Sequence, residues 1–375
     1  METRLPRIIR CFLVIFLAAA SSTVCAQNSQ VKKASAQQSV GSAAKNRARI
    51  DSILRMAKRA KTDEDLTDAL ESAREAYKSR MDAESTAYLR KLIAWLRVSR
   101  GEKFAERAGL YAEQGNDELA DEFERRALND FEKSLVAAKN WRAYHNMGVS
   151  HAMLGEFEEA LTAFDKAIQG NSQKFGNSYF NRGEVLFELG KIKAAEKDYD
   201  QAYMLDPQDV GALSGRAHCR YQLGQPELAI EDFTAALELS PEDATIYADR
   251  ADIYAQLGEW NKAARDYRVA INYDRNLSRA YQSVAWLMAT CPEEKYRNAS
   301  MAVKAAQKAI ALDGFTDFGN LDVLAAAQAA AKQFDKAQIT IKRAMEHAPA
   351  EEMPGLKYRL GEYQANRPFI DMKKR

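Results

Sequence analysis

Residues 154–168, LGEFEEALTAFDKAI, decide the fold because similar stretches follow three times downstream. The matching stretches are LGKIKAAEKDYDQAY (189–203), LGQPELAIEDFTAAL (223–237) and LGEWNKAARDYRVAI (257–271). Their glycines, at positions 155, 190, 224 and 258, are 35, 34 and 34 residues apart. Self-similarity at this period is typical of repeat proteins, in which each unit buries its apolar face against its neighbours.

A second matched segment precedes each of these glycines: WRAYHNMGVSHAM, GNSYFNRGEVLFE, VGALSGRAHCRYQ and ATIYADRADIYAQ. Good helix formers fill both segments, and no stretch alternates like a strand. The prolines fit helix boundaries, because Pro226 begins a second helix while Pro207 and Pro241 follow one. The sequence therefore predicts an all-α fold in which each unit is a pair of short antiparallel helices.

Small and aromatic residues recur at fixed positions of the repeat. Small residues let helix axes approach closely, and aromatic rings fill the hollows between them. The small positions are Gly148, Gly183, Ala217 and Ala251 in the first helices, and Ala160, Ala195, Ala229, Ala263, Ala167, Ala202, Ala236 and Ala270 in the second. The aromatic positions of the second helices are Phe164, Tyr199, Phe233 and Tyr267.

A 34-residue helix pair with these small, aromatic and proline positions resembles the tetratricopeptide repeat (TPR). The stretch AWLMATCPEEKYR (285–297), followed by LDVLAAA and a Phe-Asp-Lys-Ala second helix, resembles the C-terminal module of exported bacterial TPR proteins. The resemblance implies a right-handed superhelical solenoid. In such a solenoid the first helix of each pair lines a concave groove and the second covers the convex face.

The register divides the chain into regions. The TPR array is expected at 141–349, with divergent N-terminal helical repeats at 47–140 and a C-terminal capping helix and tail at 350–375. The units of the array fall near 141–175, 176–209, 210–243, 244–277, 278–317 and 318–349. The fifth unit has five extra residues within TCPEEKYR (290–297). This insertion is either a loop on the binding face or a rigid turn set by Pro292 above Cys291.

The first 26 residues have the layout of a secretory signal peptide. Three arginines precede a short apolar run, and Val24-Cys25-Ala26 forms a small-residue cleavage site. Ser22 and Val24 do not match a lipoprotein signal around Cys25, so a lipid anchor is disfavoured and contact with a membrane is expected only indirectly. Residues 27–46 are polar and without aromatics, which predicts a disordered linker. We therefore expect an exported protein, periplasmic or extracellular.

The balance of charges excludes general polyanion binding. The net charge is +1, so there is no global field to hold nucleic acid. Beyond the signal peptide only Cys219 and Cys291 remain, and the sequence leaves open whether they form a disulfide. We expect no nucleic acid partner.

Signatures of catalysis, metal binding and cofactor binding are absent. The four histidines form no HExxH motif and no CxxC pair exists, so neither a metal site nor a cofactor is expected. Adjacent residues such as His218 and Cys219 point about 100° apart on a helix, which excludes a nucleophile and base pair between them. Arginines at 182, 216 and 250 recur with aspartates sixteen residues later. They form either a ladder that grips a ligand or, as we favour, an ion pair within each repeat.

The TPR resemblance implies that defined first-helix positions line the groove and bind a protein or peptide partner. Asn146 and Asn181 match positions that bind a terminal carboxylate in some TPR domains, but the lysines that such clamps also use are missing. The remaining aromatic and acidic side chains predict a partner with apolar anchors and some basic character. The predicted groove residues are His145, Asn146, Asn177, Phe180, Asn181, Glu184, Phe187, Glu188, His218, Tyr221, Asp249 and Asp252.

The sequence therefore favours an exported, non-enzymatic scaffold that binds a protein or peptide through its concave groove. The alternative is a structural or assembly subunit of an envelope complex that uses its outer surface. An enzyme on a solenoid frame is disfavoured, because no cluster of residues forms a convergent polar pocket.

Overall fold

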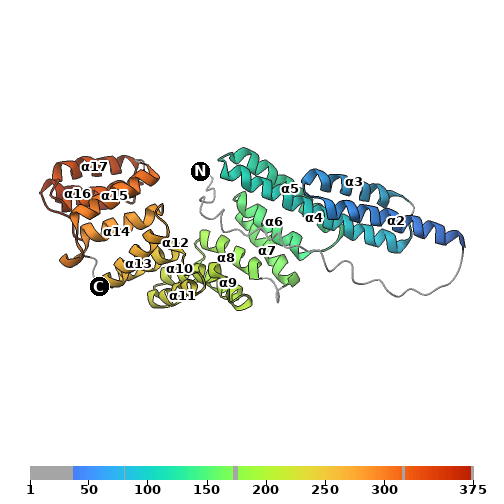
Figure 1. Cartoon of the computed structure of the whole chain (residues 1–375), viewed down its shortest axis with the longest axis horizontal. Helices are drawn as coiled ribbons and strands as arrows, with labels where there is room; N and C mark the ends of the chain where they lie inside the picture. The colour runs from blue at the N-terminus through green and yellow to red at the C-terminus, as the bar shows by residue number, and fades with distance from the viewer. Residues whose placement is uncertain (1–36, 80, 172–175, 315–316, 373–375) are drawn as a thin grey trace. The chain divides into compact units, whose positions relative to one another are not determined.

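The computed structural model describes residues 37–79, 81–171, 176–314 and 317–372, which form two compact units divided between Ala212 and Leu213. Within these ranges the chain is all-α, and it contains no strand (Figure 1). No described helix is both long enough and apolar enough to cross a bilayer. The expected signal peptide, 1–26, lies outside the described residues.

Unit 1 consists of successive antiparallel helices. The helices are α2 (Gln37–Arg59), α3 (Asp63–Lys78), α4 (Ala83–Glu113), α5 (Asp117–Ala137), α6 (Trp141–Met153), α7 (Phe157–Asn171), α8 (Gly176–Glu188) and α9 (Ile192–Leu205). Helix α2 begins inside the stretch 27–46, where we expected a disordered linker, and that expectation is wrong from Gln37 onward. Residues 37–46 extend a helix that is already formed downstream, and extending a helix costs far less than nucleating one.

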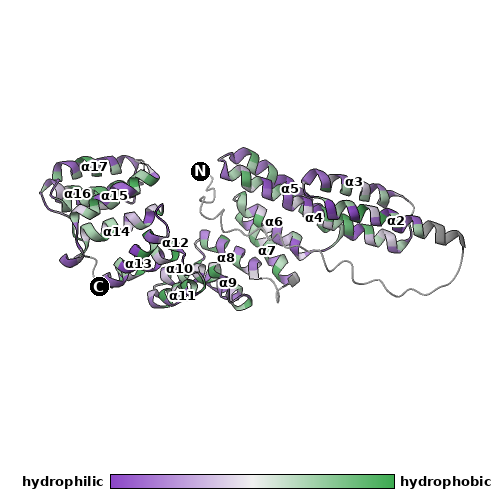
Figure 2. Ribbon diagram, in the orientation of Figure 1, coloured by the Kyte–Doolittle hydropathy of each residue, from purple (hydrophilic) through white to green (hydrophobic). Residues whose placement is uncertain are grey.

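Unit 2 contains most of α10 (Val210–Gln222) and the helix pairs that follow it. The helices are α11 (Pro226–Leu239), α12 (Ala244–Gln256), α13 (Trp260–Tyr273), α14 (Ser278–Thr290), α15 (Ala299–Asp313), α16 (Phe318–Ala330), α17 (Phe334–His347) and α18 (Met353–Gln364). Between α14 and α15 the insertion forms a short 3-10 helix, η1 (Glu294–Tyr296). Figure 2 shows hydrophobic residues on the helix faces that meet and hydrophilic residues on the outward faces.

The predicted packing of small against aromatic residues is confirmed in both units. The alanines at the repeat positions of the second helices are at most 1% exposed, and Phe164, Tyr199, Phe233 and Tyr267 at most 2%. A Cβ atom added at Gly148 would lie 2.6 Å from the ring of Phe164. The neighbouring helix can therefore approach only where the side chain is nearly absent.

The turn inside each of the four regular helix pairs, from α6–α7 to α12–α13, uses a left-handed glycine. Gly155 has a φ of 78°, and the three matching glycines have φ values between 68° and 75°. The amide after Gly155 donates to the His151 carbonyl at 2.8 Å, which closes the end of α6. In the last pair Lys332 takes this position with a φ of 61°. The glycine spacing stops after Gly258, because the next pair has the insertion at its turn and the last pair has Lys332.

The recurrent arginines and aspartates form ion pairs within each helix pair, as we favoured from the sequence. Arg182 donates two hydrogen bonds of 2.7 Å to the carboxylate of Asp198. Arg216 with Asp232 and Arg250 with Asp266 repeat this geometry at 2.7–3.2 Å. The aspartates are only 4–5% exposed, so these pairs fasten the two helices of a repeat and are not free to bind a ligand.

Candidate functional site

The predicted groove residues of α6 are buried, which corrects our expectation for them. His145 is fully buried and its Nδ1 atom lies 2.9 Å from the Ser178 hydroxyl of α8. Asn146 is 3% exposed and donates to the carboxylate of Glu102 at 2.8 Å. Arg142 holds the same carboxylate at 2.7 Å. The position that grips a ligand carboxylate in some TPR domains is therefore filled by a carboxylate of the chain itself.

Helix α8 divides its predicted groove residues between the core and the surface. Phe180 is 5% exposed and packs edge-on against Tyr199, with 5.8 Å between the ring centroids, and Asn181 is fully buried. These two side chains, which we expected to line the groove, are packed between helices. Asn177, Glu184, Phe187 and Glu188 remain half-buried. The hydroxyl of Tyr199 donates to Glu184, and burial raises the pKa of Glu188.

In unit 2 the acidic first-helix residues have partners of their own. Asp249 is 7% exposed, and its carboxylate lies 2.5 Å from Arg279 and 3.4 Å from His218. We expected Asp249 to line the groove, but its carboxylate is already paired with these two side chains. Burial opposes ionisation of Asp249, but His218 and Arg279 outweigh it and lower its pKa. His218 is itself half-buried and packs edge-on against Phe233.

A pocket of about 870 Å³ lies in unit 2 and is lined mainly by the first helices α10, α12, α14 and α16. Two predicted groove residues, Tyr221 and Asp252, belong to its wall. We call this hollow the unit 2 pocket. Its lining is Tyr221, Asp252, Ala255, Gln256, Leu257, Gly258, Trp260, Tyr267, Gln282, Ser283, Trp286, Leu287, Thr290, Cys291, Pro292, Glu293, Val323, Asp371 and Met372.

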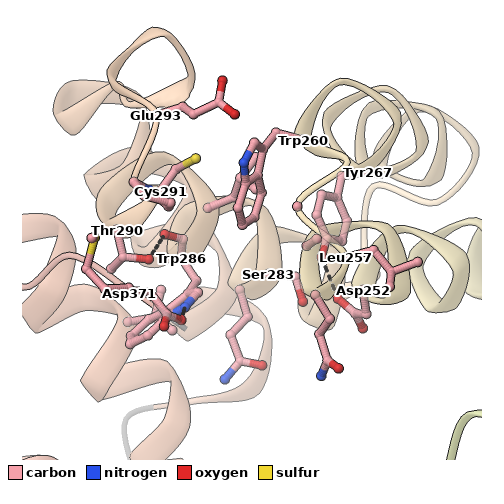
Figure 3. Close-up of a pocket in the computed structure, with 18 of the residues that line it drawn as sticks. Asp252, Leu257, Trp260, Tyr267, Ser283, Trp286, Thr290, Cys291, Glu293 and Asp371 are labelled. Atoms are coloured by element: carbon pink, nitrogen blue, oxygen red, sulfur yellow. Dashed lines mark hydrogen bonds between the residues drawn. The ribbon is translucent and has the colours of Figure 1, made fainter. Parts of the chain in front are cut away.

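Two tryptophans form much of the apolar wall of the unit 2 pocket. Trp260 lies between the loop that carries Cys291 and Glu293 and the opposite side formed by Leu257 and Tyr267 (Figure 3). Trp286 lies on α14, where its indole donates to Asp371 at 3.2 Å. The structure shows both rings half-buried, with one side available to the pocket.

Three carboxylates line the pocket, those of Asp252, Glu293 and Asp371. Asp252 and Glu293 form an acidic edge, and Lys295 lies 3.0 Å from Glu293. Asp252 accepts a hydrogen bond of 2.5 Å from the Tyr267 hydroxyl, and one of its oxygens lies 3.7 Å from Arg279. Burial raises the pKa of Asp252, although Tyr267 and Arg279 act in the opposite direction. Glu293 enters from the inserted loop on the other side (Figure 3). A cationic or hydrogen-bond-donating ligand suits this edge better than an anionic one.

The insertion in the fifth repeat, residues 290–297, has a feature of each of the two interpretations, a rigid turn above Cys291 and a loop beside a possible binding surface. Cys291 is 2% exposed and packed beneath the turn, while Pro292 and Glu293 line the pocket. The amide of Asn298 donates to the Met288 carbonyl at 2.9 Å, which closes the loop onto α14. Cys219 and Cys291 do not form a disulfide, and burial raises the pKa of the Cys291 thiol. A raised thiol pKa disfavours the reactive thiolate.

The segment after α18 is part of the site that sequence reasoning missed. Asn366 adopts a left-handed φ of 56° and ends the helix, and Pro368 follows two residues later. The chain then returns to α14, where the amide of Asp371 donates to the Thr290 carbonyl at 2.9 Å. We call residues 366–372 the return segment.

Among the residues that the structure describes, no group of three or more potential ligands is arranged to hold a metal ion.

Comparison with family models places known repeats in the middle of the chain. One tetratricopeptide repeat model matches residues 141–205, and another matches residues 180–244 and 214–278. Tetratricopeptide repeat protein 16 of Homo sapiens is 39% identical over 69 residues, covering 18% of this chain and 8% of that protein. Superkiller protein 3 of Schizosaccharomyces pombe is 31% identical over 103 residues, or 27% of this chain and 7% of that protein. The matches therefore span less than a tenth of these relatives.

Solved structures share the fold. A tetratricopeptide repeat protein from Parabacteroides merdae superposes with a TM-score of 0.50 at 19% identity, over 70% of this chain and 98% of its own. YrrB, described as a TPR protein with an unusual peptide-binding site, gives a TM-score of 0.39 at 22% identity, over 48% of this chain and 90% of its own. The chain thus has the TPR solenoid fold, and residues 141–278 match tetratricopeptide repeat models.

Proposed function

We propose that this chain is an exported, non-enzymatic scaffold that binds a segment of a partner protein in the unit 2 pocket. Proteins with TPR repeats typically mediate interactions with proteins or peptides. The observation that carries the proposal is the pocket itself, about 870 Å³ of space lined by first helices and by two half-buried tryptophans. Recognition sites of this kind depend on a few aromatic anchors in partly enclosed pockets.

The partner is an extended peptide with an apolar anchor and a basic residue. Trp260 and Trp286 offer two aromatic surfaces for the anchor. Asp252 and Glu293 stand at the edge, where a lysine or arginine of the partner would be attracted. The predicted groove contacts in α6 and α8 take no central part, since His145, Asn146, Phe180 and Asn181 are all buried.

Export is proposed from the first 26 residues, in which three arginines precede a short apolar run and a small-residue cleavage site. A periplasmic or extracellular setting follows from the same pattern. A scaffold without catalysis agrees with the general use of TPR repeats as interaction modules. Partner binding in the cell envelope is the activity that we assign to the pocket.

Site-specific photocrosslinking in the native cell envelope tests the pocket against the outer surface. A photoreactive residue replaces Gln256, which is exposed and lines the pocket, or Leu228, which is 40% exposed on the second helix α11. We expect a discrete protein adduct from position 256 and none from position 228. A Trp260→Ala change should remove the first adduct. Adducts from position 228 alone would reject pocket binding and favour the alternative, an assembly subunit that uses its outer helices.

A further inference from the structure

The return segment contacts unit 2 as a bound peptide would. Phe369 lies against Trp286 with 5.8 Å between ring centroids, and against Tyr358 at 6.2 Å. The carboxylate of Asp371 accepts from the Trp286 indole at 3.2 Å, and its amide donates to the Thr290 carbonyl at 2.9 Å. The segment therefore uses an aromatic anchor, an acidic side chain and a main-chain hydrogen bond, which are the elements of peptide recognition.

The surface beneath the return segment is held rigid by the fold. The guanidinium of Arg359 stands over Trp286 at 5.6 Å and over Phe369 at 5.5 Å. Two hydrogen bonds of 2.8 Å and 2.6 Å fix this guanidinium to the buried Asp322 of α16. We call the surface formed by Trp286, Thr290 and Arg359 the docking strip. Preorganised aromatic and guanidinium groups lower the entropic cost of binding an extended chain.

The return segment is attached more loosely than the helices that surround the docking strip. Asn366, Arg367 and Pro368 are exposed, and Met372 is 72% exposed. Phe369, Ile370 and Asp371 are only half-buried. Segments with few buried contacts open at low cost while the rest of a domain stays folded. The docking strip can therefore exchange one occupant for another.

We propose that the docking strip binds partner peptides with an aromatic residue and, two positions later, an acidic residue, and that the return segment occupies it until such a peptide displaces it. This inference deepens the proposed function, because Trp286 and Thr290 of the strip and Asp371 of the return segment all line the unit 2 pocket. The return segment itself supplies the pattern, with Phe369 and Asp371 separated by one residue. A partner peptide that also carries a basic residue after this pattern would suit the acidic edge of the pocket.

The test uses a fluorescent synthetic peptide of residues 366–375, NRPFIDMKKR, and the full chain without its signal peptide. The parent holds its own segment at a high effective concentration, so the added peptide competes poorly. The variant Phe369→Ala with Asp371→Ala releases the strip. We expect fluorescence anisotropy to show binding to this variant about tenfold tighter than binding to the parent. Equal affinities, or no binding to the variant, would overturn the proposal.

Two controls separate recognition from general damage. Arg367→Ala changes the same segment at a side chain that is 63% exposed and pairs with Glu362 on α18, away from the docking strip. This variant should bind the peptide like the parent. A peptide with alanine in place of its phenylalanine and aspartate should not bind the released variant. Asp371→Ala alone removes one side-chain bond and should give an intermediate affinity even if the double variant folds poorly. Binding of the alanine peptide as tightly as the original would reject the recognition pattern.

Crosslinking from position 256 distinguishes failure of this inference from failure of the proposed function. If the return segment is a displaceable occupant, the double variant should give more partner adduct than the parent. Less adduct would mean that the segment is a fixed wall of the site, which overturns the inference and leaves pocket binding intact. Peptide binding to the released strip without any adduct in either protein would support the inference and reject the partner-binding function.

Discussion

Asn146 in unit 1 and Asp249 in unit 2 occupy the same position of their repeats, two residues before the small residue of the first helix. Both are buried and both are bound to charged groups, Asn146 to Glu102 and Asp249 to Arg279. Asp252, three residues after Asp249, lines a pocket of about 870 Å³, whereas a hollow in unit 1, beside Tyr144 on α6 and α7, measures about 310 Å³. Repeat register therefore identifies the inner face, while the neighbouring side chains decide whether that face is open.

The largest expected change in stability comes from removing a partner of the buried carboxylate of Glu102 in unit 1. Arg142→Met removes the cation beside Glu102, which is 4% exposed, and leaves it the hydrogen bond from Asn146. Stranding a buried charge is strongly destabilising, so we expect a loss of about 3 kcal/mol in the free energy of unfolding. Urea denaturation measures this loss. The double variant with Glu102→Met should recover most of it, and a single variant as stable as the parent would contradict the network.

A smaller effect is expected from overpacking a helix pair of unit 2. Ala229 is fully buried at the contact between α10 and α11, so Ala229→Leu should cost about 1–3 kcal/mol. Thermal melting of the variant gives the result. Ala194→Leu is the matched control, because Ala194 is exposed on α9 and should stay within about 0.5 kcal/mol of the parent. Equal melting of both variants would mean that the register assigned to the small residues is wrong.

The buried carboxylates of Glu102 and Asp249 should change the free energy of unfolding in opposite directions as the pH rises. Burial raises the pKa of Glu102 above 4.5 despite Arg142 and Asn146, so the folded state binds its proton more tightly. Its contribution to stability is therefore lost as the pH rises above 4.5. The pKa of Asp249 is lowered, because His218 and Arg279 outweigh the effect of burial. Its contribution is lost as the pH falls below 3.8.

Denaturation curves at several pH values test this contrast. Glu102→Gln should flatten the decline above 4.5, and Asp249→Asn should flatten the loss below 3.8. Each effect should be smaller than that of Arg142→Met, because protonation removes a charge without removing a side chain. The same slope in either variant as in the parent would show that the residue concerned does not control stability in its range.

The smallest effect on stability is expected inside the unit 2 pocket. Gln256 is exposed at the pocket wall, so Gln256→Arg should change the free energy of unfolding by less than about 0.5 kcal/mol. The added positive charge should nevertheless weaken a basic partner, because it approaches the acidic edge formed by Asp252 and Glu293. Partner adducts from a photoreactive residue at Gln282 provide the measurement. An undiminished adduct would argue against a basic partner.

The fold could be predicted from the sequence because its determinants are local and periodic. Phe164 and its small neighbour Gly148 lie within one repeat, and Arg182 and Asp198 lie within the next, so spacing alone brings each pair together. The divergent N-terminal region contains the same packing of a small residue against an aromatic ring, but its spacing does not reveal it. A Cβ atom at Gly101 would lie 2.5 Å from the Phe131 ring, yet the long helix α4 places this pair outside the regular period.

The candidate site was less predictable because its contacts join distant parts of the chain. Asn146 is closed off by Glu102, which lies 44 residues earlier in the divergent region. Trp286 bonds to Asp371, which lies 85 residues later. The 34-residue spacing of the repeats does not predict contacts between residues that lie 44 or 85 positions apart. The insertion at Pro292 and the helix stop of Asn366 followed by Pro368 were visible signals, but they indicate where the chain turns and not what it then meets.

The ion pairs within repeats bear on how such an array can evolve. Arg216 binds Asp232 within the pair α10–α11, and Arg250 binds Asp266 within the pair α12–α13. A gene duplication that copied one pair would also copy its counter-charge, and a deletion would remove both partners together. Array length could therefore change between descendants without stranding a guanidinium, while the end elements that shape the pocket stayed as they were.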